Sequence, residues 1–189
     1  MVRASDYDKT RLIVLEEINA ALDAVDGKKV EEMIEMICLA EKVFVVGVGR
    51  VLLMLQAFVK RLNHIGINAN YVGAINEPAI TAKDVLVVGS GSGESIVPVA
   101  IAKVAKKHNA RIILIGSNTK SSVGEIADLF IRIPCRTKLN LEDEIASNQP
   151  MSSLFEQSLL LFSDIVVLMI IKRKSLDLKT LWYKHANLE

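Results

Sequence analysis

Five short runs of mainly apolar residues recur along the chain, and most of them are rich in β-branched side chains. They span residues 42–47, 68–72, 84–88, 111–115 and 129–133. A continuous apolar run of about four to eight residues is typical of a strand that is covered on both faces. The pattern therefore predicts five buried strands.

Helical spacing of apolar residues fills most of the intervals between these runs. Helices are predicted over 52–65, 95–108 and 122–128, whereas Pro78 indicates a loop between residues 72 and 84. Strands that alternate with helices imply right-handed crossovers and a parallel sheet. The expected fold is α/β: a three-layer, doubly wound, flavodoxin-like sheet of five parallel strands with helices on both faces.

Further helical patterns lie at both ends of the chain. A helical extension occupies about 6–40 and is divided at Gly27, and helices over 151–172 and 176–185 close the chain. The length of 189 residues gives room for one domain, so we predict a single domain over 1–189 that includes both helical ends. The polar stretch 134–150 has no regular pattern, and loops of that length are often functional, so it is a candidate lid.

The predicted helix over 151–172 is apolar around nearly its whole circumference, so all of its sides must be covered. One side can lie on the sheet, and we expect a second subunit on the other. The alternative is that the N-terminal helices cover it. Its most apolar part, 158–171, is interrupted by Asp164 and is shorter than a membrane span, so no membrane association is expected.

Charge and cysteine content exclude several classes of protein. The formal net charge is +1, which gives no overall field to attract nucleic acid or an anionic membrane. Cys38 and Cys135 have no spacing typical of a disulfide scaffold or a zinc site. The first residues, Met1–Asp6, carry no apolar stretch of a signal peptide, which indicates a cytoplasmic protein.

Two glycine-containing loops follow predicted strands. The first, Gly47-Val48-Gly49-Arg50, combines free backbone amides with a cation, but Leu52 stands where a dinucleotide-binding loop needs its third glycine. A tight turn without a ligand is an equally good interpretation of this loop alone. The second loop is Ser90-Gly91-Ser92-Gly93-Glu94-Ser95, whose hydroxyls and amides suit a single phosphate, the alternative being a flexible turn with a serine cap.

These motifs resemble those of a known family. The serine-rich loop is similar to the signature of the sugar isomerase (phosphosugar-binding) fold. The segments Gly47–Arg50, Lys60–Gly66, Gln149–Glu156 and His185–Glu189 resemble the 6-phospho-3-hexuloisomerase family more narrowly. That similarity extends from the N-terminal helices to the last residue.

The resemblance implies an enzyme that interconverts arabino-3-hexulose 6-phosphate and fructose 6-phosphate through an enediol, with no cofactor and no metal. It implies Glu156 as the base, with Arg50 and His185 as further catalytic residues. The substrate-binding residues that it implies are Gly49, Arg50, Val51, Ser90, Gly91, Ser92, Gly93, Glu94 and Ser95. The partners that it implies are a phosphorylated ketohexose and further copies of the chain, as a dimer or tetramer through the C-terminal helices.

Some alternatives stay open at this point. Glu156 also suits the first turn of a helix electrostatically, His185 is equally a surface residue at a helix end, and His64 is better interpreted as a core or interface residue. The family usually has serine where this chain has Val51, which leaves room for a different phosphosugar. A phosphosugar-binding sensor without turnover is the alternative from another functional class.

Overall fold

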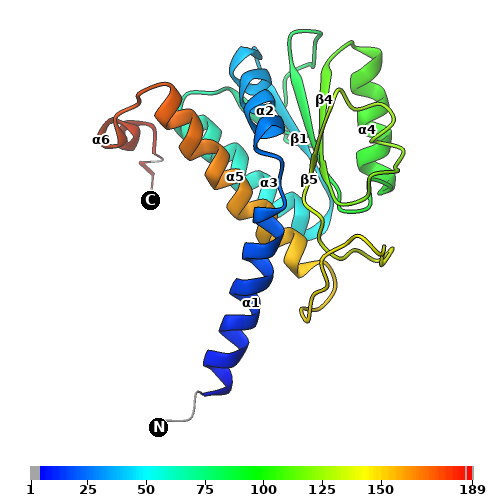
Figure 1. Cartoon of the computed structure of the whole chain (residues 1–189). Helices are drawn as coiled ribbons and strands as arrows, with labels where there is room; N and C mark the ends of the chain where they lie inside the picture. Colours follow the sequence, from blue (N-terminus) through cyan, green and yellow to red (C-terminus); the bar gives the residue numbers. More distant parts are fainter. Residues whose placement is uncertain (1–4, 186, 189) are drawn as a thin grey trace.

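A computed structural model describes residues 5–185, 187 and 188 of the chain. At its centre lies a parallel sheet with the strand order β2-β1-β3-β4-β5 (Figure 1). The strands are β1 (Val43–Val46), β2 (Ala69–Tyr71), β3 (Val85–Gly89), β4 (Arg111–Gly116) and β5 (Leu129–Arg132). The predicted five-stranded parallel sheet is confirmed.

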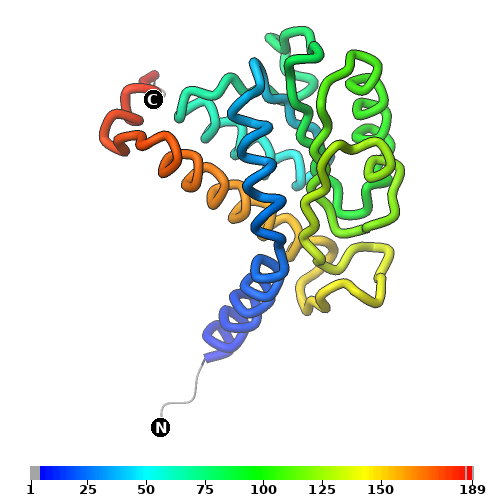
Figure 2. The backbone as a smooth tube through the Cα atoms, turned by 45° about the horizontal axis from the view of Figure 1, so that its top comes forward, coloured from blue at the N-terminus to red at the C-terminus, as the bar shows by residue number. Residues whose placement is uncertain are grey.

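Helices cover both faces of the sheet, as predicted. One face carries α2 (Gly27–Leu39), α3 (Gly49–His64) and α5 (Ser153–Arg173), and the other carries α4 (Ile96–Lys107) (Figures 1 and 2). Alternate side chains of a strand enter opposite cores: Val43 and Val45 pack with α3 and α5, whereas Phe44 and Val46 pack with α4. Because both faces are buried, the strands are continuously apolar.

The N-terminal extension forms α1 (Asp6–Asp23), which begins at a capping box made by Ser5 and Asp8. Part of α1 extends beyond the body of the molecule (Figure 1), and its buried residues are Glu17 and Ala21. The predicted division of the extension lies just before Gly27. There the Asp26 side chain accepts the Lys28 N–H and starts α2, with Gly27 as its first residue.

The predicted helix over 122–128 is wrong, because this segment forms turns. Two helix-like backbone bonds do form, from Glu125 N–H to Ser121 O and from Ala127 N–H to Val123 O. Tertiary hydrogen bonds hold the two ends of the segment: the Glu94 carboxylate accepts from the backbone N–H and hydroxyl of Ser122, and Asp128 accepts the Ile112 N–H. The Ser121 hydroxyl oxygen accepts the Gly124 N–H. These contacts outweigh a weak local preference for helix.

Two irregular segments agree with the sequence analysis. Residues 72–84 form a loop, and residues 134–150 have no helix and a single isolated bridge, between Cys135 and Ile145.

The predicted last helix, 176–185, is shorter than expected: it consists of α6 (Leu178–Leu181) and a 3-10 turn, η1 (Trp182–Lys184).

Helix α5 is long and apolar enough to cross a membrane by length and composition, so the judgement that this part of the chain is too short for a span was wrong. However, 56% of its most apolar window is buried inside the fold, which is typical of a core helix. Helices α1, α2 and α3 pack against it. The N-terminal helices therefore cover part of α5, as the alternative interpretation expected. Leu161, Ile165 and Leu168 remain exposed after that packing, which keeps a second subunit as a candidate for the rest.

Candidate active site

A pocket of about 280 Å³ lies beyond the carboxyl ends of β1 and β3. These neighbouring strands mark the point where the strand order reverses, which is where ligands bind in open α/β sheets. Its lining residues are Val48, Gly49, Arg50, Val51, Gly89, Ser90, Gly91, Ser92, Ser95, Thr137, Lys138, Ser152, Phe155 and Glu156. The fold thus brings together most of the site residues named from the sequence, and the volume suits a small ligand.

Three helices begin at this pocket, and none of them is capped by a side chain. The N-cap residues Val48 of α3, Ser95 of α4 and Ser152 of α5 make no side-chain cap hydrogen bond. By contrast, side chains cap α1, α2 and α6 at Ser5, Asp26 and Asp177. An uncapped helix start leaves backbone N–H groups without a partner at the positive end of the helix dipole. The pocket is therefore suited to an anion.

The serine loop has a fixed shape before any ligand is bound. Ser90 and Ser92 are buried, and their hydroxyl oxygens accept the N–H groups of Gly93 (3.0 Å) and Glu94 (3.3 Å). The Ser95 hydroxyl lies 3.4 Å from that of Ser90 and does not cap α4. One of these two hydroxyl groups donates to the other, so the loop keeps the proton of the second, and that of Ser92, for a ligand.

Gly93 and Glu94 shape this loop and are not among the residues that line the pocket. Gly93 has a φ of +67°, and a Cβ there would collide with the Ser121 side chain. The Glu94 carboxylate accepts from Ser122 N (2.7 Å) and Oγ (2.8 Å), and these bonds lower the pKa of Glu94. The pocket geometry does not support their predicted contact with substrate, because Glu94 is turned toward the neighbouring turn.

Glu156 and Arg50 meet inside the pocket. Arg50 Nε lies 2.9 Å from Glu156 Oε2, and the two residues come from the first turns of α3 and α5. The Glu156 side chain is 11% exposed, whereas that of Arg50 is 58% exposed. A nearly buried carboxylate is thus oriented by a cation that keeps one side toward solvent. Arg50 and Glu156, two of the three catalytic residues named from the sequence, thus both line the pocket.

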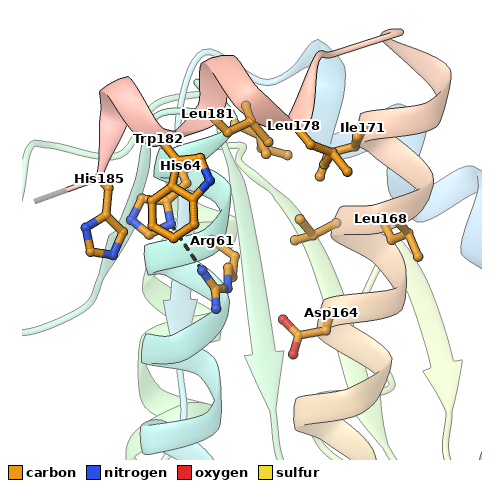
Figure 3. A pocket seen from close by; sticks show the side chains of 11 residues that line it. Arg61, His64, Asp164, Leu168, Ile171, Leu178, Leu181, Trp182 and His185 are labelled. Carbon is orange, nitrogen blue, oxygen red and sulfur yellow. Dashed lines mark hydrogen bonds between the residues drawn. The ribbon is translucent and has the colours of Figure 1, made fainter.

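His185 lies elsewhere in the chain, in a cavity of about 450 Å³ between α3, α5 and the C-terminal segment (Figure 3). Its ring centroid is 5.3 Å from that of His64 and 5.5 Å from that of Trp182. Burial lowers the pKa of His64, and the charges of Lys60 and Arg61 lower it further. Within one chain, the fold does not bring His185 to Glu156, so its catalytic role stays a prediction that needs a second subunit.

The sequence analysis did not single out five lining residues: Thr137, Lys138, Ser152, Phe155 and Gly89, the last residue of β3. The first two lie on the irregular segment 134–150, whose length alone indicated a functional loop. Glu144 shapes that segment by accepting from the backbone N–H and hydroxyl of Thr137. Ser152 and Phe155 fall inside the Gln149–Glu156 motif, so the motif was the available signal for them.

Glu17 of α1 holds the other end of the same segment. Its Oε1 accepts from the backbone N–H (2.7 Å) and the side-chain amide (2.9 Å) of Asn148. Its Oε2 accepts from the Ser147 hydroxyl (2.6 Å) and the Gln149 side-chain amide (3.0 Å). Burial alone would raise the pKa of Glu17, but these four hydrogen bonds outweigh it and lower that pKa to about 2. No pattern in the sequence pointed to this residue.

The lowered pKa of Glu17 predicts how stability depends on pH. An unfolded glutamate takes up a proton near pH 4.5, whereas Glu17 in the folded protein stays ionised down to about 2. Its contribution to stability is thus present above pH 4.5 and is lost as the pH falls toward 2. We expect the unfolding free energy of Glu17→Gln, measured in urea, to fall less steeply over this range than that of the wild type. Equal slopes for the two proteins would contradict this assignment.

Comparisons with known proteins show the family to which the chain belongs. Residues 36–168 match the model of the SIS domain family. The chain is 37% identical to a 3-hexulose-6-phosphate isomerase of Bacillus subtilis, over 93% of this chain and 95% of that protein. It is 34% identical to a protein of the same name from Mycobacterium gastri, over 100% of this chain and 94% of that protein.

A solved structure from Methanococcus jannaschii superimposes with a TM-score of 0.83 at 32% identity. The match covers 96% of this chain and 99% of that one, for which a molecular function of 3-hexulose-6-phosphate isomerase has been inferred. Both the sequence and the fold therefore match along nearly the whole chain. The chain belongs to the SIS domain family and, within it, to the family of the 3-hexulose-6-phosphate isomerases.

Proposed function

We propose that this protein interconverts arabino-3-hexulose 6-phosphate and fructose 6-phosphate. The observation that carries the proposal is one pocket that is lined by three uncapped helix starts, a serine loop and Glu156. An isomerase of a phosphosugar needs an anion site and a base at a fixed separation. Its relatives named 3-hexulose-6-phosphate isomerase support the identity of the sugar.

The phosphate binds at the serine loop in this proposal. The hydroxyl groups of Ser90, Ser92 and Ser95 donate to its oxygens, together with backbone N–H groups at the start of α4. Hydrogen bonds to a charged group are about twice as strong as those between neutral groups. The phosphate therefore holds the sugar chain while the carbonyl moves.

Glu156 transfers the proton in this mechanism. Its carboxylate removes the proton from C2 of the 3-hexulose, and the C2–H electrons form the C2–C3 double bond of an enediolate while the C3 carbonyl becomes an oxyanion. The proton of the C2 hydroxyl passes to the neighbouring C3 oxyanion, the Glu156 carboxyl group returns its proton to C3, and the electrons of the C2 oxyanion form the carbonyl of fructose 6-phosphate, with a hydroxyl group left at C3. Atoms and electrons balance without an oxidant, and the same carboxylate serves both steps.

Arg50 stabilises the negative charge of the enediolate and orients Glu156. Its guanidinium stays charged at neutral pH, so it serves as a donor and not as a base. Lys138, which also lines the pocket, adds a second cation. Val51 offers only its backbone N–H where the family usually has a serine hydroxyl, and that N–H belongs to the uncapped first turn of α3.

A coupled assay tests the proposed function. Arabino-3-hexulose 6-phosphate is generated in the assay mixture and supplied to the purified protein. The fructose 6-phosphate that forms is converted to glucose 6-phosphate, and the oxidation of glucose 6-phosphate is followed. We expect catalytic formation of fructose 6-phosphate. Tight phosphosugar binding without any product would instead support the sensor function. Turnover of a different phosphosugar, with none of the 3-hexulose, would show that the proposed substrate is wrong.

We further propose that the chain forms a homo-oligomer, a dimer or tetramer, through the exposed apolar side chains of α5. Leu161, Ile165 and Leu168 are each more than 40% exposed, and α1 adds the exposed Leu12 and Leu15. We expect light scattering to give a mass above that of one chain, and Ile165→Glu to lower it toward the monomer. A wild-type monomer in dilute solution would contradict this proposal.

We place the enzyme in the cytoplasm in this proposal. A sugar phosphate is an anion that does not cross an apolar bilayer unaided, because the transfer of its charge out of water costs too much free energy. The enzyme therefore acts in the compartment where its substrate is made.

A further inference from the structure

The segment that leads into α5 is held by one carboxylate from another helix, that of Glu17 on α1. Glu17 accepts hydrogen bonds from Ser147, Asn148 and Gln149, three consecutive residues that lie directly before Pro150 and the start of α5. In Figures 1 and 2, the C-terminal half of α1 lies beside the segment that runs into α5. The chain that carries Glu156 is thus anchored to a helix about 130 residues earlier in the sequence.

The start of α5 has no side-chain cap and follows a residue in a left-handed conformation. Its N-cap, Ser152, makes no side-chain cap hydrogen bond. Met151, just before it, has a φ of +55°, a conformation that costs free energy for a residue with a side chain and persists only where neighbouring structure enforces it. Leu154 and Phe155 of the first turn pack in the core, and the hydrogen bonds to Glu17 hold the segment that enters this turn.

Glu17 binds this segment with both of its carboxylate oxygens. It is 9% exposed and accepts four hydrogen bonds from three uncharged residues, and no ion pair involves it among the described residues. These hydrogen bonds favour the ionised carboxylate despite its burial, so the contact contributes to stability as well as to geometry. Because four donors meet two oxygens, the segment has little freedom to shift.

We propose that Glu17 is a positioning residue of the active site: by holding residues 147–149 it fixes the start of α5, and with it the places of Ser152 and Glu156 in the pocket. This proposal rests on the proposed isomerase function. Glu17 does not line the pocket and touches no reacting atom. It acts through the segment that it binds.

The variant Glu17→Gln tests the proposal, with Glu16→Gln on the exposed side of α1 as the matched control. An amide keeps one acceptor oxygen, but its NH2 group then faces the NH2 group of Gln149. A misplacement of about 1 Å can cost up to about 10²-fold in rate. We expect kcat to fall at least about tenfold, with KM changed less than about twofold because the serine loop is untouched.

Two further measurements separate positioning from general destabilisation. Amide hydrogen exchange in Glu17→Gln should become faster in residues 147–156 and stay unchanged in the central strands. The double variant Glu17→Gln with Gln149→Glu reverses donor and acceptor, and should recover most of the lost kcat. If Glu17→Gln does not fold, Ser147→Ala, which removes one of the four donors, should show the same changes at smaller size.

Several results would overturn the proposal. Unchanged exchange in residues 147–156 would show that Glu17 does not hold them, and faster exchange with an unchanged kcat would show that holding them does not matter for catalysis. If the wild type itself does not isomerise the sugar, the proposed function fails. The exchange rates then decide the positioning proposal alone, and unchanged rates overturn it.

Discussion

Glu156→Gln is expected to lower the turnover number by about 10²- to 10⁴-fold while phosphosugar affinity stays close to that of the wild type. The amide keeps the shape of the side chain and can still accept a hydrogen bond from Arg50, whose Nε lies 2.9 Å from the carboxylate. It cannot take up the C2 proton. Binding and chemistry should therefore separate in this variant.

Steady-state kinetics and direct titration with fructose 6-phosphate measure the two effects on the same preparation. Glu142→Gln is a suitable control, because Glu142 is an exposed glutamate on the segment 134–150 and does not line the pocket. Undiminished turnover in Glu156→Gln would remove Glu156 from the mechanism. His185 of a neighbouring subunit would then be the next candidate for the base.

Ser95→Ala is expected to weaken phosphosugar binding by about 10- to 150-fold, which corresponds to about 1.5–3 kcal/mol for a hydrogen bond to a charged group. The Ser95 hydroxyl lines the pocket and makes no cap hydrogen bond, so its removal should change affinity much more than stability. Ser92→Ala should weaken binding in the same direction. Its hydroxyl also supports the loop, because its oxygen accepts the Glu94 N–H.

Ser95→Thr is the matched control, because threonine keeps the hydroxyl group. We expect this variant to bind nearly as tightly as the wild type when calorimetry is carried out with fructose 6-phosphate or inorganic phosphate. An alanine variant that binds as well as the threonine variant would show that the phosphate does not use this hydroxyl.

The sheet was predictable from the sequence because its strands are buried on both faces, so that each appears as an uninterrupted apolar run. The pocket was predictable for a related reason: the carboxyl ends of parallel strands share one edge, so Gly49 and Ser90 had to lie near one another. The segment 122–128 was not predictable from its local pattern. Its turns depend on Glu94 and on other residues that are distant in sequence.

The same limitation applies to Glu17 and Glu94. Helical periodicity places Glu17 on a helix, but nothing local indicates that its carboxylate binds residues 130 positions away. Glu94 stands inside a phosphate-like loop, yet its side chain caps the turn at Ser122. Long-range hydrogen bonds decided both orientations, and a single sequence does not reveal them.

Isomerisation in deuterated water tests the central claim most directly. If Glu156 moves a proton between C2 and C3, fructose 6-phosphate formed by the wild type should carry deuterium at C3, because the carboxylate exchanges its proton with solvent during some turnovers. Glu156→Gln should form almost none of this labelled product while it still binds the sugar. Equal rates of labelled product from both proteins, or wild-type binding with no exchange and no product, would contradict the account.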